Sequence, residues 1–132
     1  MRAMSKYQFT CAVEPQYLSD QSSPQEGTFA FAYTVTITNS GSTTAQLISR
    51  HWIIDDAQGH TEEVKGLGVV GHQPLLQPGE SLQYSSGTRL KTANGTMHGS
   101  FFCVAEDGEQ FYCPIAPFAL IADSDQPSPT LH

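Results

Sequence analysis

The sequence predicts an all-β protein, built as an antiparallel β-sandwich of about seven strands with minimal helix. Three observations carry this prediction: apolar and polar residues alternate with a period of two, turn signals separate the alternating segments, and no long window keeps a helical period. The chain has 132 residues, 39% of them hydrophobic. A chain of this size buries a single core without metal or disulfide support.

The first long strand is predicted from Phe29 to Thr38, where aromatic and aliphatic side chains alternate with Ala and Thr. The next strand, Gln46 to Asp55, is expected to be central in its sheet because it has apolar residues on both faces. Strict alternation puts Ile48, Trp52 and Ile54 on one face and Leu47, His51 and Ile53 on the other. His51 is therefore expected to point inward, and Trp52 is expected to lie in the core.

Turn signals divide the middle of the chain into shorter strands. His60 to Lys65 predicts a short strand that leads into a glycine-rich segment. Pro78-Gly79 is typical of a type II turn, after which the next strand runs through Leu82 and Tyr84. Asn94-Gly95 predicts another tight turn.

A final hairpin is predicted at the end of the domain. One strand runs through Met97, Phe101 and Cys103, and the other extends from Phe111 to Leu120. This last strand contains Pro114 and Pro117. Proline cannot donate to a strand ladder, so the strand is expected at an edge or with bulges.

The three cysteines, Cys11, Cys103 and Cys113, are expected to be reduced and mostly buried. If Asp107-Gly108 is a two-residue turn, Cys103 and Cys113 lie on opposite faces of the sheet, where their sulfurs cannot bond. A three-residue loop would reverse that conclusion. No C-x-x-C pair indicates a zinc site.

The charge balance excludes several partners. Six Lys and Arg against thirteen Asp and Glu give a net charge of −7, which repels nucleic acid and anionic membrane surfaces. No apolar run approaches the ~18 residues of a membrane span. The first residues lack the apolar segment of a secretory signal. We therefore expect no membrane insertion and a cytoplasmic location.

Residues 66–71 spell G-x-G-x-x-G, which makes Gly66, Gly68 and Gly71 a candidate ligand or partner loop. This motif holds a pyrophosphate when a strand leads into it and a helix begins at it. Pro74 and Pro78 disfavour that helix. We interpret the segment as a loop whose glycines allow positive φ or close backbone approach. The alternative is a nucleotide or pyrophosphate site with weak phosphohydrolase activity.

A divalent-cation site is a further alternative, with Asp55, His60, Glu62 and His72 as candidate ligands. His60 and Glu62 lie two apart on a predicted strand and so share a face. Imidazole with carboxylate suits cobalt better than magnesium. An exposed polar strand explains the same residues without metal, and no cofactor is required. No nucleophile with a base is recognisable, so an enzyme is not expected.

Several segments together resemble the ApaG family. They are Phe31 to Ile37, Trp52-Ile53-Ile54, Glu63-Val64 followed by Gly66 to Gly71, Pro78-Gly79-Glu80, Tyr84 to Gly87, Gly95-Thr96-Met97 and Ile115 to Leu120. The resemblance covers about residues 7–121 and implies an immunoglobulin-like or fibronectin-III-like β-sandwich there. Residues 1–6 are then a loose N-terminus and residues 122–132 a loose tail.

The resemblance also implies a function. The family is linked genetically to cobalt resistance and magnesium efflux, and its domain occurs in eukaryotic F-box and polymerase-interacting proteins. We therefore expect a non-enzymatic binding or regulatory module with an unknown protein partner. Four apolar residues near the glycines could be exposed to that partner: Leu67, Val69, Val70 and Leu75. They could equally fold inward and cap one end of the sandwich. A homodimer through an edge strand is a further option, which the prolines of the last strand oppose.

Overall fold

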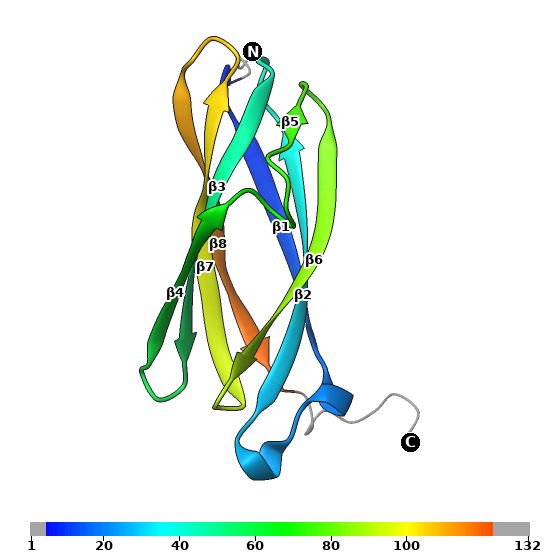
Figure 1. Ribbon diagram of the computed structural model, residues 1–132, viewed down its shortest axis with the longest axis vertical. Coiled ribbons are helices and arrows are strands. Elements are labelled where there is room, and N and C mark those ends of the chain that lie inside the picture. Colours follow the sequence, from blue (N-terminus) through cyan, green and yellow to red (C-terminus); the bar gives the residue numbers. More distant parts are fainter. Residues whose placement is uncertain (1–4, 123–132) are drawn as a thin grey trace.

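The computed structural model describes residues 5–122, which form two antiparallel β-sheets packed face to face (Figure 1). The smaller sheet has the order β1-β2-β6 and contains β1 (Phe9–Tyr17), β2 (Phe29–Asn39) and β6 (Ser81–Leu90). The larger sheet has the order β4-β3-β7-β8 and contains β3 (Ala45–Asp56), β4 (Thr61–Leu67), β7 (Asn94–Ala105) and β8 (Gln110–Ile121). The two-residue β5 (Leu75–Leu76) pairs with the start of β3.

The predicted sandwich is thus confirmed, with two strands, β1 and the very short β5, that the sequence analysis did not locate. Within residues 5–122, helix is limited to two single 3-10 turns, η1 (Ser19–Gln21) and η2 (Pro24–Glu26). This part of the chain holds no helix that is long and apolar enough to cross a membrane. Of the loose ends predicted at 1–6 and 122–132, residues 1–4 and 123–132 lie outside the described residues.

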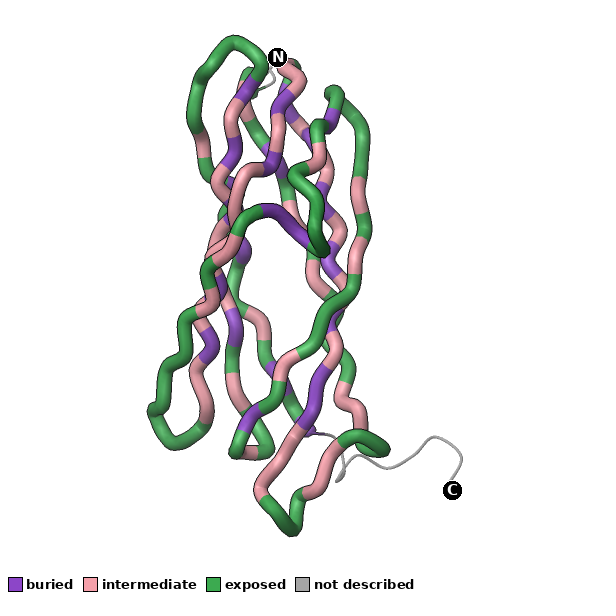
Figure 2. The backbone as a smooth tube through the Cα atoms, viewed as in Figure 1, coloured by how far each residue is buried: buried purple, intermediate pink, exposed green. Residues whose placement is uncertain are grey.

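The core lies between the two sheets, and buried residues alternate with more exposed ones along much of β2 and β7 (Figure 2). The predicted aromatic and aliphatic face of β2 is buried from Phe31 to Ile37. Across from it, Trp52 of β3 packs its ring 5.2 Å from that of Tyr33. Burying a large apolar side chain contributes about 1.5–3 kcal/mol to the stability of the folded state. Burial of these inward faces is therefore the main stabilising contribution to the fold.

A β-bulge at Ile48 changes the faces predicted for β3. Leu47 pairs with Cys103 while Ser49 pairs with Phe102, so Ile48 is an extra residue in β3. The bulge moves Leu47 to the same buried face as Trp52, and it turns His51 to the outer face. The prediction of an inward His51 was therefore wrong, because strict alternation cannot show a bulge. β3 is central, as predicted, with neighbours on both sides.

Two turn predictions had opposite outcomes. Gly79 has φ +86°, as the predicted type II turn requires. The tight turn at Asn94-Gly95 was wrong, because both residues pair with β8 and the chain turns over residues 91–93. Gly95 is instead a point of close approach, since a Cβ there would lie 2.5 Å from the Asp55 carbonyl oxygen.

The β7–β8 hairpin closes through a three-residue loop, the second of the two alternatives that the sequence left open. The Ala105 N–H donates to the Glu109 carbonyl, and Gly108 takes φ +91°. This register places Cys103 and Cys113 on the same buried face, the outcome predicted for a three-residue loop. β8 is an edge strand with a bulge opposite His98, where Met97 pairs with Phe118 and Gly99 with Ile115. Both effects expected of its prolines are thus confirmed.

All three cysteines are free thiols, as predicted. Cys103 and Cys113 are buried and Cys11 is half-buried. Burial raises the pKa of Cys11 to about 11 and the pKa values of Cys103 and Cys113 to about 12. These side chains are therefore neutral components of the core at physiological pH.

Candidate functional site

The glycine loop between β4 and β5 has a structural reason for each of its three glycines. The Val69 N–H donates to the His72 carbonyl over 2.7 Å and the His72 N–H donates back over 2.9 Å, which closes a two-residue turn. Val70 and Gly71 at its centre have φ +42° and +81°, as a type I′ turn requires. Gly68 combines φ +65° with a position where a Cβ would meet the His72 carbonyl oxygen. Positive φ and close approach, as predicted, explain the motif, and no helix follows it.

Arg50 explains the remaining glycine. It lies opposite Gly66 in the β3–β4 ladder, and a Cβ on Gly66 would lie 2.7 Å from its guanidinium. Arg50 Nη1 donates to the carbonyl oxygens of Leu67 and Gly68, over 3.1 and 2.9 Å. The Gly68 N–H in turn donates to the carbonyl of the bulged Ile48 over 2.8 Å. The loop is therefore fixed to β3 at several points.

A small hollow of about 200 Å³ lies beside this loop, between the two sheets. Arg50 and Val70 border it on one side, and Tyr84 and Ser86 of β6 border it on the other. The Tyr84 hydroxyl is buried without a hydrogen-bond partner among the described residues. Burial raises the pKa of Tyr84, so this hydroxyl stays protonated.

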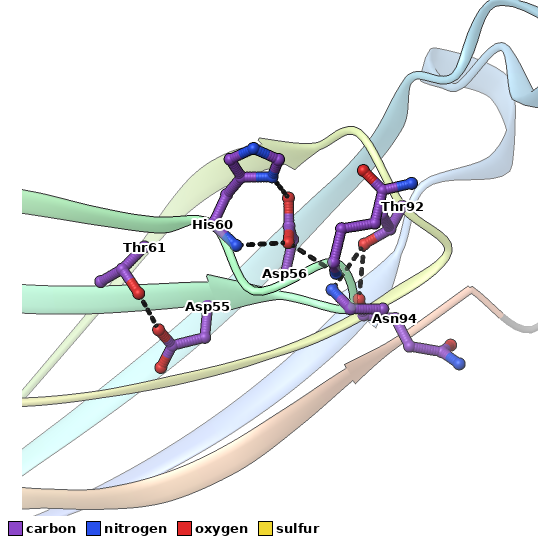
Figure 3. Close-up of polar contacts among 8 residues, drawn as sticks. Asp55, Asp56, His60, Thr61, Thr92 and Asn94 are labelled. Carbon is purple, nitrogen blue, oxygen red and sulfur yellow. Dashed lines mark hydrogen bonds and ion pairs between the residues drawn. The ribbon is translucent and has the colours of Figure 1, made fainter.

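The candidate metal ligands are not assembled into one site. Asp55 and Asp56 end β3 on opposite faces, because consecutive side chains of a strand alternate (Figure 3). Asp55 Oδ1 accepts a hydrogen bond from Thr61 Oγ1 over 2.6 Å. Asp56 Oδ1 accepts hydrogen bonds from the backbone N–H groups of Gln58 and His60, over 2.8 and 2.9 Å.

Of the four candidates, His60 and Glu62 lie along one hollow of about 240 Å³, where His60 Nδ1 is 3.3 Å from Asp56 Oδ2. Hydrogen bonds from the backbone of His60 hold the pKa of Asp56 below its usual range. His72 belongs to the type I′ turn beyond the far end of β4. Within residues 5–122, no group of three or more His, Cys, Asp or Glu side chains is placed to hold a metal ion.

A larger hollow, of about 530 Å³, lies on the outer face of the larger sheet. Four strands contribute to its lining, which includes Ser49 and His51 of β3, Lys65 and Leu67 of β4, Phe102 of β7 and Tyr112 of β8. The rings of Phe102 and Tyr112 pack with centroids 5.3 Å apart. Leu67 and Tyr112, which both line this hollow, are 74% and 67% exposed.

The charges around this outer hollow differ from those of the whole chain. No carboxylate lines it, although the chain carries a net charge of −7, and Lys65 contributes an ammonium group. At its border His51 Nε2 lies 2.8 Å from Glu63 Oε2. The hollow therefore combines apolar side chains with the basic groups of Lys65 and Arg50, and the Glu63 carboxylate lies at its border.

Sequence reasoning found part of this surface. Of the two alternatives for this segment, Leu67, Val70 and Leu75 follow the exposed one. Val69 follows the inward one and is 1% exposed. Phe102, Tyr112 and Arg50 were missed. The segment Glu106-Asp107-Gly108 is a usual three-residue loop and would have given the register that puts Tyr112 outside. No comparable signal marks the bulge that turns Arg50 toward the loop.

Comparison with known proteins defines the class to which this sandwich belongs. The family model of the ApaG domain matches residues 19–105. Protein ApaG of Acidovorax sp. (strain JS42) is 70% identical over 92% of this chain and 90% of its own. Protein ApaG of Ralstonia nicotianae is 57% identical over 89% of this chain and 94% of its own.

A solved structure agrees with the sequence relatives. The crystal structure of the ApaA protein from Bordetella pertussis superposes with a TM-score of 0.90 at 51% identity, covering 92% of this chain and 99% of that one. The chain belongs to the ApaG family, as its sequence motifs indicated.

Proposed function

We propose that this protein is a non-enzymatic binding module that recognises a protein partner through the outer hollow of its larger sheet. The observation that carries the proposal is that the exposed Leu67 and Tyr112 and the half-buried Phe102 line one hollow. Exposed aromatic residues that already pack against each other dominate protein interfaces, because they bury large areas at a low cost in conformational entropy.

The chemistry of the surface indicates the kind of partner. The apolar centre suits an aliphatic or aromatic side chain, and Lys65 at the rim suits a carboxylate on the same partner. All four contributing strands are held by ladder hydrogen bonds, so the surface is rigid before binding. A rigid surface loses little entropy when a partner docks.

The family resemblance connects this module to cobalt tolerance, and we propose that the connection runs through the partner and not through a bound ion. The candidate ligands Asp55, His60, Glu62 and His72 are divided between two faces and two ends of the sheet. A cytoplasmic location follows from the same proposal, since cation homeostasis would require access to intracellular partners.

The proposal is tested by growth in inhibitory Co²⁺, in a bacterial strain whose own family member is deleted. We expect the wild-type protein to restore growth and the double variant Leu67→Ser/Tyr112→Ser to fail, because it removes the apolar centre. Ile121→Ser is the matched control, since Ile121 is also an exposed apolar residue (56%) but lies outside the hollow. A photo-crosslinking residue at position 112 should give a discrete adduct that the same residue at position 121 does not give.

Two outcomes would contradict the proposal. If the folded double variant restores growth as well as the wild type, the outer hollow does not carry the function. If the wild type itself fails to restore growth, the connection to cobalt tolerance is wrong. Circular dichroism and a thermal melt confirm that each variant is folded before the growth assay.

A nucleotide or pyrophosphate ligand is a second candidate function, and one observation favours it: the Arg50 guanidinium lies at the glycine loop beside a hollow. Two loop carbonyls already occupy Arg50 Nη1, and β5 follows the loop where the motif requires a helix. We therefore expect pyrophosphate and ADP at about 1 mM to leave the melting temperature unchanged, whereas specific binding would raise it by mass action. A rise that Arg50→Lys abolishes would favour this second function.

A further inference from the structure

The outer edge of β6 is free to pair with another strand. β6 lies at one side of the smaller sheet, and all its ladder bonds go to β2. No other backbone hydrogen bond involves Ser81–Leu90 within the described part of the chain. Its side-chain bonds also go to β2: Ser81 to Thr38 over 2.7 Å, Ser85 to Thr34 over 3.0 Å and Gln83 to Thr36 over 3.0 Å. One row of backbone N–H and C=O groups is therefore left for solvent.

The other three edge strands carry features that oppose strand addition. β8 contains Pro114 and Pro117 and a bulge. β1 contains Glu14 and Pro15 and lies against β8, where the rings of Phe9 and Phe111 are 5.5 Å apart. Charged residues and prolines at sheet edges are the usual means by which proteins prevent edge-to-edge pairing.

β4 is protected in a similar way, and β6 is not. β4 is short and carries Glu62, Glu63 and Lys65. In β6, the eight consecutive residues from Ser81 to Thr88 include no charged residue and no proline. β6 is also longer than β4, ten residues against seven. The edge that lacks protection is thus one of the longer edges of the molecule.

We infer that the free edge of β6 pairs with the same edge of a second copy of this chain. In an antiparallel pair related by a twofold axis at Ser85, residues at equal distances from Ser85 face each other. Arg89 then faces Ser81, and Gln83 faces Gly87, so no like charges meet. The strand can therefore pair with its own copy without charge repulsion, as a symmetric dimer requires.

The resulting dimer would join the two smaller sheets into one sheet of six strands and leave the outer hollow of each larger sheet free. This inference does not depend on the proposed function, because the two surfaces lie on different sheets. A single pair of strands buries less than the roughly 1,200–2,000 Å² of a stable interface, so the dimer is expected to be weak. Two copies that each carry −7 repel each other, so added salt should strengthen it.

Sedimentation equilibrium tests the inference over about 20 µM to about 1 mM protein, the range in which a small interface becomes populated. We expect the average mass to rise from 14.3 kDa toward twice that value with concentration, and to rise further on adding salt. Amide hydrogen exchange should slow in β6 with rising concentration and stay constant in β8. A mass of one chain throughout the range would overturn the inference.

Charge variants at the axis provide a specific control. Ser85→Lys and Ser85→Glu each place like charges opposite each other, so each variant alone should stay monomeric. An equal mixture of the two should dimerise at least as well as the wild type, because Lys then faces Glu. Thr10→Lys, on an exposed position of β1, adds the same charge away from the edge and should leave the dimer intact. If both single variants and their mixture dimerise to the same extent, β6 is not the interface.

Discussion

At the scale of single residues, the glycine loop shows how a ligand-binding motif can have a purely structural origin. Gly66 makes room for the Arg50 guanidinium, Gly68 passes close to the His72 carbonyl, and Gly71 completes a type I′ turn. Each requirement is local and different. A sequence match to the motif therefore does not by itself indicate a phosphate.

Alanine substitutions at two of these glycines separate the local requirements. Gly68→Ala should destabilise the protein by more than about 3 kcal/mol, because a positive φ adds about 1–2 kcal/mol and the Cβ also meets the His72 carbonyl. Gly71→Ala should cost only about 1–2 kcal/mol, since nothing lies within 4 Å of its Cβ. Urea unfolding measures both. Equal losses would contradict the described geometry of the turn.

At the scale of strands, the period of two in the sequence located six of the strands but missed β1, and it predicted strand register poorly. The period of two located β2 within a residue, because its inward face is continuously apolar from Phe31 to Ile37. The bulge at Ile48 exchanges the two faces in the middle of β3, and with them the positions of Arg50 and His51. A bulge follows from pairing with β7, which is remote in sequence, so β3 alone could not reveal it.

The same limit applies to the candidate site. The exposed Leu67 was recognisable from its place near the glycines, whereas Tyr112 depended on the length of the loop after β7. One residue more or less in that loop exchanges the faces of β8. Sites built across several strands are therefore harder to predict from sequence than the strands themselves.

The register of the β7–β8 hairpin has a chemical consequence in its buried thiols. Native Cys103 and Cys113 should resist a disulfide reagent at pH 8, because burial both shields them and raises their pKa to about 12. The half-buried Cys11 should react first, and unfolding in urea should release all three. Absorbance of the released thiolate follows the reaction, and rapid reaction of three thiols in the native protein would contradict the predicted protection.

These thiols also predict a pH dependence of stability. A thiol whose folded pKa lies above its unfolded value of about 8.5 stabilises the fold fully below that value. The contribution is lost as the pH rises from about 9 to about 12, since unfolded thiols ionise and folded ones do not. The free energy of unfolding should therefore fall less steeply in Cys113→Ala than in the wild type over this range. Parallel slopes would contradict the effect of burial.

At the scale of the whole molecule, the two sheets present different surfaces to solvent. The larger sheet presents a hollow lined by apolar side chains and by Lys65 and Arg50. The smaller sheet presents rows of Thr, Ser and Gln that end at the free edge of β6. The core that joins them contains few polar groups, with Asn39 the only buried residue of this kind among the described positions. Most polar side chains of the described residues therefore lie on the two outer surfaces of the sandwich.

This arrangement predicts the result of a Co²⁺ titration followed by amide NMR. We expect no saturable loss of signal at one equivalent, because Asp55 and Asp56 face opposite ways and His72 lies beyond the far end of β4. Weak broadening near His60 and Glu62 should remain proportional to the added metal. Stoichiometric broadening that Glu62→Gln removes would instead show a direct cation site in the hollow beside Asp56. The cobalt connection would then follow from metal binding by this chain, and the outer hollow would need another explanation.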